Sequence, residues 1–274
     1  MRAPLTVLIS GFDSLEGPAF DRDGNLFFVN WLSSSIVRRT PDGSAAEFFN
    51  TGGIPAGLAF HRDGSLYVAD EGDDIHGVVR IVDGQATILV NQYEGQPLNG
   101  ANDLVFDRNG VLYFSDPWRS SLEHPVGGFY RLFPDGNLEQ IDTGLAFPNG
   151  VALSPDKTAV YLAETRRHRI LRYPIGPDGA LGARQDFAAL PGGEGPDGMA
   201  FDEGGNLYVA HYGGGKVAIF SPAGDMVGTI PIPGAQVTNV AFGGADRRTL
   251  VITDVETGSI YQTRVDAPGL RLFG

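Results

Sequence analysis

Short apolar runs alternate with polar turns along the whole chain of 274 residues, and no stretch keeps the period of a long helix. Residues 196–211 show the repeating plan. An apolar run, a Gly-rich turn and a second apolar run lie between two polar residues, Asp197 and His211. Apolar runs separated by Asp-Gly or Asn-Gly pairs are typical of β-hairpins. The pattern therefore predicts an all-β protein.

This plan recurs six times. The first strands are expected to begin at positions spaced 40 to 48 residues apart, namely Glu16, Ala56, Asn102, Asn149, Asp197 and Thr238. A second strand follows each, and most units add a third and a fourth, as at 78–82 and 86–90. Four strands per unit at this period are typical of a propeller blade. We therefore expect residues 1–274 to form a single domain, a six-bladed β-propeller with four antiparallel strands per blade.

The last unit ends with a third strand at 259–265 and has no convincing fourth. We expect the apolar residues 5–10 to supply that outer strand. Pairing the two chain ends within one blade would close the ring and protect the sheet edges.

The chain carries a net charge of −13 with its acidic residues scattered, and it has no cysteine. A nucleic-acid-binding surface needs clustered Lys and Arg, so no nucleic acid partner is expected. The N-terminal apolar run is too short for a secretion signal, and nothing approaches the roughly 20 apolar residues of a membrane helix. We expect a soluble cytoplasmic protein without a membrane partner, as a monomer or small homo-oligomer.

The first residues of the inner strands should form a ring at one mouth of the central channel. The positions that follow are apolar and repetitive, but the ring holds two carboxylates, two carboxamides and two small residues. Such oxygen ligands suit a hard cation such as calcium, and the lack of imidazole and thiolate disfavours zinc. Asp and Asn also cap strand ends through hydrogen bonds to the backbone, which is the structural alternative. Because four of the six equivalent ring positions carry a carboxylate or a carboxamide, we favour the metal site.

A second ring is predicted on the same face, farther from the axis, where the second strands end. Its members are Asn30, Asp70, Asp116, Glu164, His211 and Asp254. The aspartates are expected to accept hydrogen bonds from loop amides. His211 departs from the column, and it is either structural or an acid, base or substrate donor. The acidic turn 71–74 is interpreted as a solvated loop, with a second cation site as the alternative.

Several motifs together resemble one family. They are Leu-Glu-Gly-Pro at 15–18, Leu-Asn-Gly-Ala-Asn-Asp at 98–103, Tyr-Phe-Ser-Asp-Pro at 113–117, Pro-Asn-Gly-Val at 148–151 with Leu-Ser-Pro-Asp at 153–156, and Pro-Asp-Gly at 196–198. From about residue 11 to 265 the chain is similar to the senescence marker protein, gluconolactonase and luciferin-regenerating enzyme family. It is more distantly similar to diisopropylfluorophosphatase.

The resemblance implies a propeller with one catalytic divalent cation in the channel mouth, and hydrolysis of lactones or, in some members, organophosphates. Glu16, Asn149 and Asp197 match the metal positions, and Asn102 matches a residue that contacts either the ion or the substrate. Asp197 matches the general base or nucleophile. Calcium is the expected ion, with magnesium, manganese, iron and zinc as alternatives. Gly100 stands where animal gluconolactonases carry an Arg, which puts a sugar lactone in doubt.

The sequence thus predicts metal-assisted hydrolysis of a lactone or related small ester. The ion would polarise the carbonyl, and Asp197 would activate water or attack directly. No other catalytic motif competes. Two alternatives stay open: a phosphotriesterase on the same ion, and a non-catalytic ligand-binding propeller stabilised by metal. Candidate substrate contacts from the face loops are Trp31, Asn99, Asn102, Trp118, Arg119 and His211.

Overall fold

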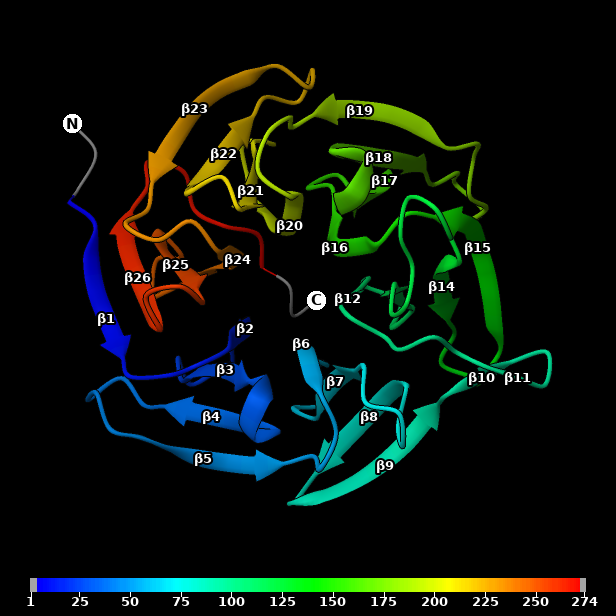
Figure 1. Ribbon diagram of the computed structural model, residues 1–274, viewed down its shortest axis with the longest axis horizontal. Coiled ribbons are helices and arrows are strands. Elements are labelled where there is room, and N and C mark those ends of the chain that lie inside the picture. The colour runs from blue at the N-terminus through cyan, green and yellow to red at the C-terminus, as the bar shows by residue number, and fades with distance from the viewer. Residues whose placement is uncertain (1–3, 272–274) are drawn as a thin grey trace.

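A computed structural model describes residues 4–271. Six four-stranded antiparallel sheets stand in a ring around a central axis, as Figure 1 shows. The predicted six-bladed propeller is confirmed. No helix in the described part of the chain is long and apolar enough to cross a membrane.

The innermost strand comes first in sequence in blades 1 to 5. Blade 1 contains β2 (Leu15–Phe20), β3 (Leu26–Asn30), β4 (Ser35–Arg39) and β5 (Ala45–Asn50). Blade 2 contains β6 (Pro55–Phe60), β7 (Leu66–Asp70), β8 (Gly77–Val82) and β9 (Gln85–Val90). Blade 3 contains β12 (Leu104–Phe106), β13 (Leu112–Asp116), β14 (Gly127–Leu132) and β15 (Leu138–Leu145).

Blade 4 contains β16 (Pro148–Leu153), β17 (Ala159–Glu164), β18 (Arg169–Pro174) and β19 (Gln185–Ala189). Blade 5 contains β20 (Gly195–Phe201), β21 (Leu207–Tyr212), β22 (Lys216–Phe220) and β23 (Met226–Pro231). Short elements in the connections are the 3-10 turns η1 (Trp31–Ser33) and η2 (Thr165–Arg167), and the hairpin of β10 (Gln92–Tyr93) and β11 (Gln96–Pro97).

Blade 6 joins the two ends of the chain. It contains β24 (Val237–Gly243), β25 (Thr249–Asp254) and β26 (Ser259–Arg264), and β1 (Thr6–Ser10) pairs with β26 as its outer strand. The register places Thr6 opposite Gln262 and Ser10 opposite Ser259. In Figure 1 the first strand, in blue, lies beside the last, in red. The predicted closure by the N-terminal strand is confirmed, and it gives the last blade the outer strand that its own segment lacks.

The hydrophobic core lies between neighbouring blades. Each of the six buried clusters combines residues from two adjacent blades, as where Tyr161 of blade 4 packs with Phe201 and Val209 of blade 5. The cluster between blades 6 and 1 also receives Leu8 and Ile9 from the closing strand. This interlocking of sheet faces fixes the inner strands around the axis.

A β-bulge interrupts the inner strands at the ring positions. In blade 5, Pro196 pairs with His211 and Met199 with Val209, so two residues of β20 stand opposite one of β21. Equivalent register shifts occur in blades 1, 2, 4 and 6. A bulge bends a strand locally and changes the direction of its side chains. Here the bulge residues include Asn149 and Asp197, and Glu16 lies directly before the bulge of its strand.

Candidate functional site

The structure brings the acidic members of the inner ring together. Asp197 and Asn149 are buried, at 6% and 5% exposure, and Glu16 is partly buried. Burial and, after it, the charge of Glu16 raise the pKa of the Asp197 carboxyl. The side chain of Thr238 donates instead to the carbonyl of Leu15, at 2.7 Å, and so joins blade 6 to blade 1.

One carboxylate oxygen of Glu16 is fully engaged in hydrogen bonds. Oε2 accepts from the backbone N–H of Gly17 at 2.6 Å and from Nδ2 of Asn239 at 3.0 Å. These contacts orient the carboxylate and leave Oε1 available to a ligand.

Asp197 contains a polar atom that the fold does not satisfy. Its Oδ1 is buried and has no hydrogen-bond partner among the described residues. Buried polar atoms in folded proteins nearly always have a partner, because an unpaired one costs about 1–3 kcal/mol. An unpaired carboxylate oxygen at a ring of oxygen ligands indicates a site for a cation or a substrate proton.

Asn102 is hydrogen-bonded to Glu71, a residue that the sequence analysis assigned to a solvated turn. Its Nδ2 donates to Oε1 of Glu71 at 2.8 Å. Glu71 is only 7% exposed, so the interpretation of 71–74 as a solvated turn is wrong for this residue. Asp73 and Asp74 of the same turn are exposed, as predicted. The backbone N–H of Glu71 donates to the carbonyl of Ile54 at 2.8 Å, which holds this end of the turn against the loop before β6.

Two further residues approach the axis directly after the ring, and neither was predicted. Asp103 accepts from the backbone N–H of Val151 at 2.7 Å, which links blade 3 to blade 4. Asn239 fills the equivalent place in blade 6, and a Cβ on neighbouring Gly198 would lie 2.0 Å from its side chain. A signal was present in the aligned repeat. This column reads Gly in the other four units, at 17, 57, 150 and 198.

The buried carboxylates resist ionisation in the protein alone. Burial raises the pKa of Glu16 to about 7, of Asp103 to about 6 and of Glu71 to about 8. For Asp197, burial and then the charge of Glu16 raise the pKa well above its ordinary value. A bound cation would remove this penalty, since an opposite charge favours the ionised form.

The oxygen donors therefore fit a divalent cation of the calcium type. Glu16 and Asp197 supply carboxylates, and Asn102 and Asn149 supply carboxamide oxygens. Within residues 4–271 no three side chains of His, Cys, Asp or Glu converge as a ready-made metal cage. The ring differs from such a cage because two of its four oxygen donors are the carboxamides of Asn102 and Asn149.

The aspartates of the outer ring accept hydrogen bonds from neighbouring loops, as predicted. Asp70 accepts from the backbone N–H of Ile54 and of Gly72, at 2.9 and 2.8 Å. Asp116 accepts from the N–H of Asn99 and of Gly100, at 3.0 and 2.7 Å. Asp254 accepts from the N–H and hydroxyl of Thr257.

His211 of the outer ring also forms a hydrogen bond to a loop, but it acts as the donor. It is 2% exposed, and its Nε2 lies 2.6 Å from the carbonyl of Gly192. Burial lowers the pKa of the imidazole, so the neutral ring donates from Nε2 to that carbonyl. This geometry corresponds to the structural alternative for His211 and turns the ring toward the loop.

Asn99 and Gly100 form a tight corner beside the site. Asn99 donates from Nδ2 to Asp116 at 3.0 Å and to the carbonyl of Val126 at 3.1 Å. Gly100 has φ +145°, and a Cβ there would lie 2.8 Å from Cβ of Trp118. No larger side chain fits at this position, which explains the glycine in place of the Arg of animal gluconolactonases.

A surface groove of about 580 Å³ runs along the loops of blades 3 and 4. Trp118, Arg119, Phe147 and Arg166 contribute to its walls. Arg119 pairs with Asp73 at 2.5 Å. Arg166 pairs with Glu194 and lies 5.6 Å above the Phe147 ring. The groove presents aromatic surface and guanidinium groups to a ligand, whereas Trp31 in η1 packs against the cluster between blades 1 and 2.

Tyr212 is another residue of this face that the sequence did not single out. Burial and the charge of Asp197 raise the pKa of its hydroxyl, so the phenol stays protonated and lies within the electrostatic reach of the site. A half-buried phenol of this kind can donate a hydrogen bond to a bound oxygen.

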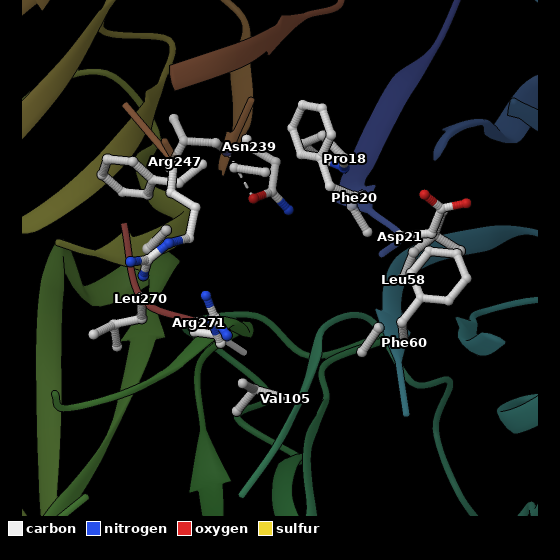
Figure 2. Close-up of a pocket in the computed structure, with 18 of the residues that line it drawn as sticks. Pro18, Phe20, Asp21, Leu58, Phe60, Val105, Asn239, Arg247, Leu270 and Arg271 are labelled. Carbon is white, nitrogen blue, oxygen red and sulfur yellow. Dashed lines mark hydrogen bonds between the residues drawn. The ribbon is translucent and has the colours of Figure 1, made fainter. Parts of the chain in front are cut away.

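A cavity of about 860 Å³ lies on the other side of the ring. Asp103 and Asn239 line it together with the downstream residues of the inner strands and, at the far end, Leu270 and Arg271. Figure 2 shows Asn239 above the cavity, Phe20 and Leu58 on one wall and Arg247 opposite. Its lining combines apolar residues with charged ones such as Asp21 and Arg247, and it does not include Glu16, Asn149 or Asp197 of the inner ring.

Sequence comparison identifies the relationship. A family model described as the SMP-30/gluconolactonase/LRE-like region matches residues 15–256. The chain belongs to this family. The resemblance derived from the motifs is therefore confirmed, and the matched region of the family model contains every ring position.

Members of the family with established names are similar over most of their length. A gluconolactonase from Zymomonas mobilis is 33% identical over 277 residues, covering 88% of this chain and 76% of the relative. Lactonase drp35 of Staphylococcus aureus is 33% identical, covering 94% of this chain and 85% of the relative. The solved structure of a gluconolactonase from Xanthomonas campestris is 29% identical with a TM-score of 0.85, covering 97% of this chain and 90% of that one.

Proposed function

We propose that this protein is a divalent-cation-dependent hydrolase of lactones or related small esters. The observation that carries the proposal is the unpaired, buried Oδ1 of Asp197 beside Glu16, in a ring that also supplies two carboxamides. Similarity to a gluconolactonase and to lactonase drp35 supports a lactone as the substrate.

Glu16, Asn149 and Asp197 would hold the cation, with Asn102 as a further ligand or as a substrate contact. Calcium is the expected ion because all four residues offer oxygen. When bound, the ion would supply Lewis-acid polarisation of the lactone carbonyl. The orientation of Glu16 by Gly17 and Asn239 prepares one oxygen for this role.

Asp197 is the residue proposed to move the proton. Its carboxylate takes a proton from water, the water oxygen bonds to the carbonyl carbon, and the ring C–O bond then breaks. The proton passes to the departing alkoxide, so the product is a hydroxy acid. Direct attack by Asp197, followed by hydrolysis of the acyl-enzyme, is the alternative role.

The groove of Trp118, Phe147 and Arg166 is proposed to bind the part of the substrate that does not react. Its aromatic surface favours a lactone with an apolar substituent, and the corner at Gly100 leaves no arginine to hold a sugar hydroxyl.

The test is hydrolysis of a lactone panel by chelator-treated protein, with calcium or another divalent cation added back. Glucono-δ-lactone, unsubstituted δ-lactones, aromatic lactones and one fluorophosphate form the panel. The proposal requires cation-dependent opening of at least one lactone. Turnover of the fluorophosphate alone would favour a phosphotriesterase, and no turnover of any compound would favour a ligand-binding propeller.

A further inference from the structure

We infer that Glu71 is a positioning residue that orients the Asn102 carboxamide, so that its carbonyl oxygen is the atom presented to the cation. The inference rests on the proposed cation site. It concerns a residue outside the ring, on a different blade from the amide that it orients.

The chemistry of the pair determines the orientation of the amide. Glu71 Oε1 and Asn102 Nδ2 lie 2.8 Å apart. A bound cation favours the ionised form of the nearby Glu71 carboxyl. In that form the carboxylate can only accept hydrogen bonds, whereas a carboxamide both donates and accepts. Rotating the Asn102 amide by half a turn would bring two acceptor oxygens together. Glu71 therefore selects the orientation in which the amide nitrogen is engaged and Oδ1 is available.

The backbone around Glu71 keeps its carboxylate in place. Glu71 follows β7 directly, and its N–H donates to the carbonyl of Ile54 at 2.8 Å. On the other side, a Cβ at Gly100 would lie 3.0 Å from Cα and from the carbonyl oxygen of Glu71. The segment leading to Asn102 is thus packed against the backbone of Glu71, which holds the two residues side by side.

The ring contains a second pair of the same design. Asn239 of blade 6 donates to Glu16 of blade 1 at 3.0 Å, and its own Oδ1 accepts from Val240 at 2.8 Å. In both pairs a side chain from the adjacent blade orients a proposed ligand. The pairs differ in charge, since Asn239 is neutral and Glu71 carries a carboxylate. A charged partner also polarises the amide, which makes Oδ1 a better ligand.

Substitution of Glu71 by Gln preserves the side-chain volume but no longer selects one orientation of the Asn102 amide. A glutamine can donate to Oδ1 of Asn102 as readily as it accepts from Nδ2. Loss of a residue that orients a metal ligand typically weakens metal binding by about 10- to 100-fold. We expect a rise of that size in the calcium dissociation constant of Glu71→Gln. Asp74→Asn removes the same formal charge from the exposed part of the turn, and it should leave the constant unchanged.

The decisive experiment is a double-mutant cycle, measured by calorimetric titration of calcium chloride into the chelator-treated full chain. The four proteins are the wild type, Glu71→Gln, Asn102→Ala and the double variant. If Glu71 acts through Asn102, its substitution will have little effect in the Asn102→Ala background. An equal loss in both backgrounds, or no loss in either, overturns the inference.

The wild-type titration separates this inference from the proposed function. Calcium binding by the wild type with an unchanged constant in Glu71→Gln overturns the inference alone. Absence of binding by the wild type overturns the calcium site and the inference together. Circular dichroism of each variant before titration reports folding. If Glu71→Gln does not fold, Glu71→Met, which also removes the acceptor at similar volume, takes its place in the cycle with the same expected results.

Discussion

The inner and outer rings lie on the same face of the propeller and draw on the same polar residue types, but they use them differently. Asp70 and Asp116 of the outer ring each accept hydrogen bonds from two backbone amides. Asp197 of the inner ring keeps a buried oxygen without a partner in the described structure. Residue type alone therefore does not distinguish the hydrogen-bonded aspartates of the outer ring from Asp197, whereas the hydrogen bonds that each one accepts do distinguish Asp70 and Asp116 from it.

Asp254 of the outer ring shows that an unpaired buried oxygen is not by itself enough to distinguish Asp197. Its Oδ2 is also buried without a partner in residues 4–271, but its Oδ1 accepts twice from Thr257. Asp197 differs because Glu16, Asp103 and Glu71 all act on its charge. An unpaired oxygen among neighbouring carboxylates is the combination that points to a cation.

The comparison predicts that the largest effect on activity comes from Asp197→Asn. Removing the proton acceptor should lower kcat for lactone hydrolysis by about 10²- to 10⁴-fold. The thermal midpoint of the metal-free protein should stay the same or rise, because the variant lacks a buried charge. Steady-state kinetics and differential scanning calorimetry on the same preparation measure both. Unchanged turnover would remove Asp197 from the mechanism.

The outer ring should show the converse response. Asp70→Ala leaves the backbone N–H groups of Ile54 and Gly72 without their acceptor. At about 1–3 kcal/mol for each unpaired buried donor, the free energy of unfolding should fall by about 2–6 kcal/mol. Urea denaturation followed by circular dichroism tests this prediction. A loss below about 1 kcal/mol would show that water satisfies these amides and would weaken the contrast between the rings.

The inner ring should also give the metal-free protein an unusual pH dependence. Folding raises the pKa of Glu16 to about 7 and that of Glu71 to about 8, so the folded state binds more protons than the unfolded state above the ordinary carboxyl range. The contribution of these groups to stability must fall as pH rises from about 4.5 to about 8. Thermal midpoints measured across this range, with and without calcium, provide the test. The cation should restore stability most strongly at the upper end, and a metal-free midpoint that rises through the range would contradict the assignment.

The smallest predicted effect concerns the groove beside the inner ring. Trp118→Ala removes apolar surface that would contact the substrate but no reacting group. We expect KM for an aromatic lactone to rise by about 3- to 10-fold with kcat nearly unchanged, since only binding outside the reacting atoms is lost. Val227→Ala, on the outer strand β23 and 58% exposed, is the control for loss of exposed apolar surface away from the groove, and it should leave KM unchanged. A fall in kcat equal to the rise in KM would place Trp118 closer to the chemistry.

Much of the fold could be predicted because the same pattern of strands and turns occurs six times in the sequence. The second strands, the Asx-Gly turns and the missing outer strand of the last unit each determined a feature that the structure confirms. The ring positions could be located for the same reason, although they are not the first strand residues that the repeat predicted. The structure places them second or third in the inner strands and, for Asn102, two residues before β12.

Residues outside the repeat were harder to interpret. Glu71 belongs to an acidic turn in which Asp73 and Asp74 are exposed, and only its burial and its contact with Asn102 in the structure reveal that it turns inward. Asp103 and Asn239 replace glycines of an aligned column, so their departure from the repeat was visible, but its meaning depended on which blade each side chain reaches. Tyr212 carried no signal, because its proximity to Asp197 arises from tertiary structure.

The most direct test of the central claim is the rate of lactone hydrolysis by chelator-treated protein as calcium is titrated back. We predict that the rate rises from near zero and saturates, and that Asp197→Asn abolishes the rise. A rate that is undiminished by chelation and independent of added cation would contradict the account.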